Sequence, residues 1–137
     1  MHDSIVLDSS VIAPIFFPEE KTRTVMAMLE DKRFITVDLA YEEVSNVAWK
    51  RCMFSNEDLK ISREALTNCI TFITDVCTVM PARDLIMGAF TDAHTYSITV
   101  YDALFLAAAK KCKVPLLTLD AKLFQKIKDS EKVLLVS

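Results

Sequence analysis

Ile5-Val6-Leu7-Asp8, close to the amino terminus, is a short apolar run that ends in a carboxylate. Consecutive apolar residues are typical of a strand that is covered on both faces, whereas a half-exposed strand alternates apolar and polar residues. Leu116-Leu117-Thr118-Leu119-Asp120 repeats the pattern, with a short, mostly apolar strand followed directly by an aspartate. The two stretches therefore predict buried strands of a parallel sheet, each with an acid at its carboxyl end.

Strands and helices alternate along the rest of the chain. Further strands are expected at 34–37, 76–80 and 133–136, and helices at 19–31, 39–54, 55–74, 82–95, 101–111 and 121–128. Asp38 is expected to cap the helix that begins at Leu39, and Ser55-Asn56-Glu57-Asp58 resembles a capping box for the next helix. This alternation predicts an α/β fold, with helices on both faces of a parallel sheet.

Composition and length describe one globular domain. The chain has 137 residues, of which 52% are hydrophobic and 26% charged, and it contains no repeat or linker, so we expect a single domain over residues 1–137. No apolar run approaches the roughly 18 residues of a membrane span, and no basic leader precedes the first strand. The single glycine, Gly88, excludes the glycine-rich loops that bind nucleotides, since those loops need several glycines.

Cysteine and histidine are poorly placed for zinc. The cysteines stand singly, at Cys52, Cys69, Cys77 and Cys112. None forms a Cys-x-x-Cys pair, and His2 and His94 are the only histidines. We therefore expect reduced, mostly buried thiols in a cytoplasmic protein, and no zinc site built on histidines.

Charge is unevenly distributed. The net charge is −3, yet residues 1–46 hold nine acids and four bases, whereas residues 110–137 hold seven lysines and three acids. A basic segment beside an acidic cleft can meet a phosphate backbone, and it can equally be an ordinary solvated surface.

Three aspartates are predicted to lie along one edge of the sheet. Right-handed crossovers place all carboxyl ends of parallel strands at that edge, where open α/β sheets bind ligands. Asp8 and Asp120 follow predicted strands, and Asp102 stands in the first turn of a helix that is apolar on nearly every side. Each acid alone could form a salt bridge or cap a helix, and Asp102 in particular could cap its own.

Helix geometry adds a fourth acid, Glu43. At 100° per residue, Glu43 lies beside Val47, on the border of an apolar stripe that includes Val44, whereas Glu42 points towards solvent. A carboxylate at such a border needs a partner, because an unpaired buried charge is costly. Only Lys122, near Asp120, is a base within two residues of any of the four acids.

Four carboxylates without matching bases favour a hard divalent cation, Mg²⁺ or Mn²⁺. One or two such ions can generate a hydroxide nucleophile and stabilise the charge of a phosphodiester under in-line attack. Ser10 and Thr118, two residues from Asp8 and Asp120, could orient metal-bound water, or could simply cap the backbone.

The motifs around these acids resemble those of PIN-domain nucleases. The four matching segments are Val6–Ile12, Glu43–Val47, Ser97–Ala107 and Pro115–Leu123. They occur in the family's order over almost the whole chain, and the length is similar to that of the compact VapC-type toxins of toxin–antitoxin systems. The resemblance carries the four acidic positions over as Asp8, Glu43, Asp102 and Asp120, with Ser10 as the matching hydroxyl.

The resemblance has further implications for fold and function. It implies a PIN-like three-layer α/β/α fold with a mainly parallel five-stranded sheet, and Mg²⁺- or Mn²⁺-dependent endoribonuclease activity. It also implies a homodimer, and a small antitoxin that can insert a basic side chain into the acidic site.

Three other functions fit the sequence less well. A PIN-fold nuclease of RNA processing or DNA-end cleavage would usually carry extra domains, for which 137 residues leave little room. A catalytically inactive PIN-like binding module would be expected to lack one of the four acids. A phosphorylatable receiver domain needs an acidic pair after the first strand and an Asp after the third, but Ser9 follows Asp8 and the third strand ends in Met80-Pro81.

Overall fold

The computed structural model describes residues 3–137, so His2 lies outside the described residues. Five parallel strands form its central sheet, in the order β3-β2-β1-β4-β5. The strands are β1 (Asp3–Leu7), β2 (Lys32–Val37), β3 (Thr78–Met80), β4 (Leu116–Thr118) and β5 (Val133–Leu135). The predicted α/β class and the five-stranded parallel sheet are both confirmed.

Seven α-helices and one 3₁₀ turn complete residues 3–137. They are α1 (Ser9–Phe16), α2 (Thr22–Met28), α3 (Leu39–Phe54), α4 (Leu59–Asp75), η1 (Ala82–Asp84), α5 (Ile86–Tyr96), α6 (Val100–Cys112) and α7 (Ala121–Ile127). None of the helices in this part of the chain is both long and apolar enough to cross a membrane.

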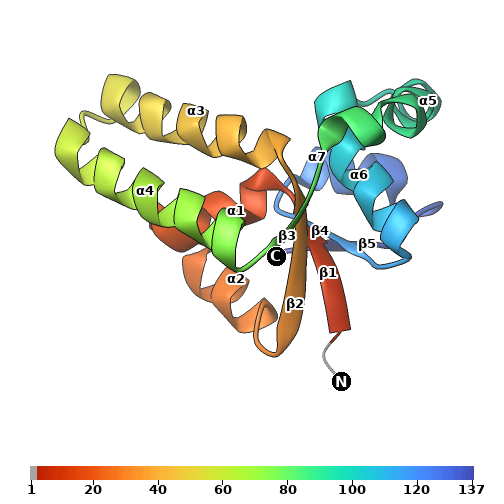
Figure 1. Cartoon of the computed structure of the whole chain (residues 1–137), viewed down its shortest axis with the longest axis horizontal. Helices are drawn as coiled ribbons and strands as arrows, with labels where there is room; N and C mark the ends of the chain where they lie inside the picture. Colours follow the sequence, from red (N-terminus) through yellow and green to blue (C-terminus); the bar gives the residue numbers. More distant parts are fainter. Residues whose placement is uncertain (1–2) are drawn as a thin grey trace.

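Strand order explains the layers. The chain moves from β1 outwards to β2 and β3, then returns across the sheet to β4 and continues to β5. Because crossovers are right-handed, the outward connections place α1 to α4 on one face, and the return places α5 to α7 on the other. Figure 1 shows these two groups of helices on opposite sides of the strands.

The core is centred on β1 and α6. Ile5, Val6 and Leu7 of β1 are buried, and so are all seven residues 103–109 of α6, which packs on β1, β2 and β4. This confirms the prediction that α6 is apolar around most of its circumference and deeply buried. Burial fixes α6 in place, and so fixes Asp102 in its first turn at the edge of the sheet.

One helix was not predicted. No helix is expected at α1, because Pro14 lies inside it. A proline inside a helix removes a backbone hydrogen-bond donor and usually ends the helix. The segment folds as a helix nonetheless, because Val11, Ile12 and Ala13 are buried against the core. The helix expected at 19–31 is the shorter α2.

Two capping predictions need correction. Asp38 precedes α3, but its carboxylate accepts a hydrogen bond from the backbone N–H of Ala82 at 2.9 Å and caps no N–H of α3. Ser55 ends α3, and Asp58 instead caps α4 by accepting from the Lys60 N–H at 3.1 Å. The capping box at 55–58 was therefore wrong, although a helix does begin directly after it.

Candidate active site

Two of the four acids lie at the point where the strand order switches from one side of β1 to the other. The strand after β1 lies on one side of it and β4 on the other, and the crevice at such a reversal is the usual ligand site of α/β sheets. Asp8 follows β1 and Asp120 lies two residues beyond β4. The pairing of Leu7 with Leu117 holds these two strand ends side by side.

Asp8 is the buried member of the group. Only 6% of its surface is exposed, and the Ser10 hydroxyl donates a hydrogen bond to its Oδ1 at 2.5 Å. The pKa of Asp8 is raised to about 6, mainly by burial and to a smaller extent by the negative charge of Asp102, while hydrogen bonds from Ser10 and Thr118 act to lower this pKa. The fold therefore holds a carboxylate where its ionised form is poorly solvated.

Ser10 and Thr118 connect the ends of β1 and β4. The Ser10 hydroxyl accepts from the Leu119 N–H at 3.0 Å, and the Thr118 hydroxyl lies 3.5 Å from Ser10 Oγ. Thr118 Oγ1 also accepts from the Asp120 N–H at 3.0 Å. In the structure these hydroxyls thus bind Asp8 and the backbone that leads to Asp120.

Glu43 lies at the side of the same edge. It is half-buried, and the Ser9 hydroxyl donates to its Oε1 at 2.7 Å, whereas Glu42 is exposed. Burial raises the pKa of Glu43, a hydrogen bond from Ser9 lowers it, and the charges of Asp102 and then Glu42 raise it. The predicted contrast between the two glutamates is confirmed in burial, although both side chains border one surface hollow.

Ser9 is the residue that sequence reasoning missed here. It directly follows Asp8, but its partnership with Glu43 depends on α1 packing against α3. Because α1 was not predicted, no sequence signal placed Ser9 beside the α3 acid.

Asp102 interacts electrostatically with the other three acids. It is half-buried, and the pKa of Asp102 is raised first by burial and then by Asp120, while a hydrogen bond from Thr99 and the charge of Lys126 lower it. Thr99, and not Asp102, caps α6, accepting from the Asp102 N–H at 3.1 Å. The carboxylate of Asp102 therefore has no capping role in its own helix.

Asp120 is the most exposed of the four. Its Oδ1 accepts from the Leu123 N–H at 3.1 Å, so it caps α7 while its remaining oxygen stays available. The capping alternative considered for Asp102 thus applies to Asp120.

None of the four acids forms a salt bridge within residues 3–137. Their donor atoms are all carboxylate oxygens, the class that Mg²⁺ and Mn²⁺ prefer. No three acid, Cys or His side chains in this part of the chain are close enough to enclose a metal ion by themselves. The donor chemistry of the four acids fits a hydrated Mg²⁺ or Mn²⁺ ion, since Mg²⁺ usually keeps several waters and takes only a few protein carboxylates.

The cysteines lie outside this site. All four are free thiols, and burial raises the pKa of Cys69 and Cys77 to about 12. A thiol with such a pKa carries almost no thiolate at neutral pH, so these two cysteines do not act as nucleophiles.

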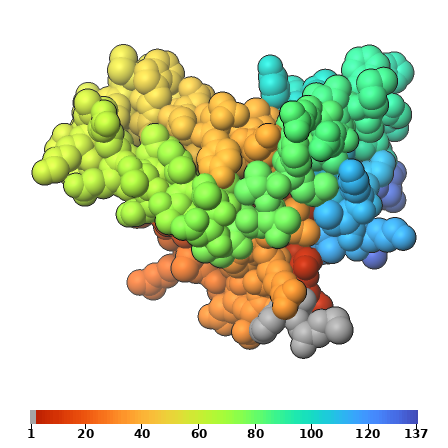
Figure 2. Space-filling view, in the orientation of Figure 1, coloured from red at the N-terminus to blue at the C-terminus, as the bar shows by residue number. Residues whose placement is uncertain are grey.

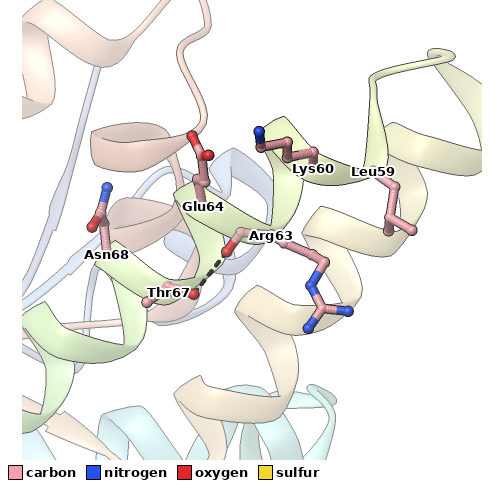
Figure 3. A pocket seen from close by; sticks show the side chains of 6 residues that line it. All are labelled: Leu59, Lys60, Arg63, Glu64, Thr67 and Asn68. Carbon is pink, nitrogen blue, oxygen red and sulfur yellow. Dashed lines mark hydrogen bonds between the residues drawn. The ribbon is translucent and has the colours of Figure 1, made fainter.

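Two hollows on the surface differ in the residues that line them. One of about 640 Å³ runs along α4, and Figure 3 shows that all the residues lining it come from that single helix. Another, of about 450 Å³, lies beside Ser9 and Glu43 and joins α1, α3 and the start of α6. In Figure 2 the outline is indented between the orange start of α3 and the teal start of α6. Of these two hollows, the second includes one of the four acids, Glu43, in its lining.

Comparison with known proteins places most of the chain in one family. The sequence model of the PIN domain matches residues 5–129. Ribonuclease VapC3 of Pyrobaculum aerophilum is 32% identical over 126 residues, covering 89% of this chain and 93% of its own.

Two solved structures share the fold. VapC20 of Mycobacterium tuberculosis, a sarcin–ricin loop cleaving toxin, superposes with a TM-score of 0.72 at 15% identity, over 93% of this chain and 95% of its own. A toxin–antitoxin complex from Klebsiella pneumoniae gives 0.65 at 17% identity, over 97% and 98%. The chain is a member of the PIN domain family and a homologue of the VapC ribonucleases.

Proposed function

We propose that this protein is a divalent-metal-dependent endoribonuclease of the VapC toxin type, with Asp8, Glu43, Asp102 and Asp120 as its metal-binding and catalytic acids. The observation that carries the proposal is that Asp8, Glu43 and Asp120 each interact electrostatically with Asp102, and that none of these four acids forms a salt bridge within residues 3–137. The ribonuclease name of a relative at 32% identity supports RNA as the substrate.

The chain's own residues would prepare the site for phosphodiester hydrolysis. A bound Mg²⁺ or Mn²⁺ supplies Lewis acidity and offsets the negative charge of a phosphate. Ser10 holds Asp8 and Ser9 holds Glu43, so both carboxylates keep their orientation when substrate arrives. Asp102, fixed by the buried α6, approaches them from the opposite face of the sheet, and Asp120 completes the edge after β4.

A small antitoxin is the proposed protein partner. Solved relatives of the same fold include toxin–antitoxin complexes. Because the four acids form no salt bridge within residues 3–137, they could bind a basic side chain of such an antitoxin, which would compete with the metal and inhibit cleavage. A homodimer remains a prediction from the family resemblance.

Purified protein incubated with labelled RNA tests the proposal. We expect cleavage in MgCl₂ or MnCl₂, its loss in EDTA, and its return on adding excess metal. Single-stranded and duplex DNA of matching sequence serve as comparison substrates. Cleavage that persists in EDTA would contradict metal dependence, and a preference for DNA ends would favour the alternative role in DNA-end cleavage.

Glu43 and Glu42 form a matched pair on one turn of α3. Glu43→Gln is expected to lower the rate of RNA cleavage by about 10- to 100-fold, because the half-buried carboxylate held by Ser9 loses its charge. Glu42→Gln should stay within about twofold of wild type. The measurement is the initial rate at saturating metal; equal losses in both variants would contradict the role given to Glu43.

A further inference from the structure

Tyr101 forms one wall of the hollow beside the acids. It immediately precedes Asp102, and 62% of its surface is exposed although residues 103–109 of the same helix are buried. An exposed ring on so apolar a helix adds nothing to the core. Because Tyr101 lines the same hollow as Ser9 and Glu43, a ligand in this hollow would contact its ring.

The opposite wall belongs to α3. Asn46 and Lys50 are exposed on this helix, four residues apart, and both line the hollow together with Glu43 and Ser9. Residues at this spacing lie on the same face of a helix. The hollow therefore presents an aromatic ring on one side, and an amide and an ammonium group on the other.

These three groups match the parts of one unpaired nucleotide. Aromatic rings stack on bases, amides hydrogen-bond to base edges, and lysines contact phosphates. A volume of about 450 Å³ lies within the range of small-molecule sites. The lining of the larger α4 hollow contains neither an aromatic residue nor any of the four acids (Figure 3).

We propose that this hollow binds an unpaired base adjacent to the scissile phosphate, with Tyr101 as the stacking surface and Lys50 as a contact to the neighbouring phosphate. This inference rests on the proposed ribonuclease function and narrows its substrate to RNA that is single-stranded at the cleavage point. A base inside a duplex is stacked on both faces and does not present a face to the Tyr101 ring.

Binding without cleavage separates this inference from the proposed function. The Kd of a fluorescent single-stranded oligoribonucleotide is measured for three proteins: the Asp8→Asn variant, which keeps Tyr101, and the same variant with Tyr101→Phe or Tyr101→Ala added. We expect Tyr101→Ala to weaken binding about 5- to 100-fold, because stacking is lost, and Tyr101→Phe to stay within about twofold. Binding of the same sequence as a duplex should be unaffected by either change.

Phe90→Ala is the matched control, because Phe90 on α5 is 61% exposed and lies outside the hollow. If Tyr101→Ala binds as tightly as its parent, or if Phe90→Ala weakens binding equally, the subsite is overturned. If Tyr101→Phe loses as much as Tyr101→Ala, stacking is overturned as its basis. In the Asp8-containing protein, Tyr101→Ala should raise KM more than it lowers kcat.

Lys50 is tested by salt. Lys50→Ala should reduce the slope of log Kd against log salt concentration by about 0.7, the value for one phosphate contact on a single strand. Lys60→Ala on α4, also exposed, should leave the slope unchanged. An unchanged slope for Lys50→Ala would overturn the phosphate contact. Absence of RNA cleavage by wild type would contradict the proposed function alone, since the binding results are obtained without it.

Discussion

Replacing Asp8 by Asn is expected to reduce RNA cleavage by about a thousandfold or more while making the metal-free protein more stable. The loss follows because Asp8 supplies charge to the proposed cation, whose effect on a phosphodiester transition state amounts to several kcal/mol, at about 1.4 kcal/mol per tenfold change in rate. Asp102→Asn should behave alike in cleavage, since Asp102 interacts electrostatically with the three other acids. Initial rates at matched protein concentration provide the measurement.

The gain in stability comes from the burial of Asp8. Its pKa is about 6 in the folded protein against an ordinary value of 3.8. An acid whose pKa is raised by folding contributes stability that is fully present below its unfolded pKa and is lost as pH rises through its folded pKa. At pH 7 the ionised carboxylate therefore costs about 1 to 3 kcal/mol, which Asn avoids while still accepting from Ser10.

Denaturant unfolding in EDTA at several pH values tests this second effect. The advantage of Asp8→Asn over wild type should be largest near pH 7 and disappear towards pH 4. Normal cleavage by the variant would contradict its placement in the metal site. A variant less stable than wild type at pH 7 would show that Asp8 contributes more to the fold as a charged acceptor than its burial costs.

Saturating Mn²⁺ or Mg²⁺ is expected to raise the melting temperature by several degrees. The four acids, which form no salt bridge within residues 3–137, repel one another in the metal-free protein, and a cation that binds only the folded state relieves this repulsion. At about 100 times its dissociation constant, such a cation adds roughly 2.7 kcal/mol. In a domain of this size, each kcal/mol shifts the melting temperature by a few degrees.

Ionic strength is the competing explanation for such a shift. NaCl at matched ionic strength should have a much smaller effect, because screening acts weakly on partly buried charges. Asp102→Asn should respond much less to either divalent salt. If NaCl reproduces the whole shift, or if the variant responds as strongly as wild type, the acids do not form a specific cation site.

Most of the fold could be predicted from the sequence, because the sheet is buried on both faces. Uninterrupted apolar runs such as Ile5-Val6-Leu7, followed by acids, were enough to place strands and to predict a shared carboxyl edge. The apolar border on α3 likewise separated Glu43 from Glu42. In these cases one physical requirement, covering apolar surface, fixes both the pattern of residues and the structure.

What the sequence did not reveal depended on contacts between distant segments. Helix α1 could not be predicted, because the backbone preference of Pro14 opposes a helix, whereas burial of the neighbouring apolar side chains against the core favours one. The bond between Ser9 and Glu43 and the exposure of Tyr101 follow from how α1, α3 and α6 pack. No local pattern encodes those positions.

The place of β4 has a consequence for how the enzyme is made. β1 pairs with residues 116 and 117, and Ser10 bonds to Leu119, so the centre of the sheet joins segments more than a hundred residues apart. On the ribosome, the first three strands and the α1 to α4 layer can assemble before residues 116–120 have been synthesised. Asp8 is then present without Asp120, and its neighbouring strand position is still empty. Nascent chains and fragments that end before β4 therefore lack a complete acidic edge, so the proposed cleavage activity is expected only once the chain extends past residue 120.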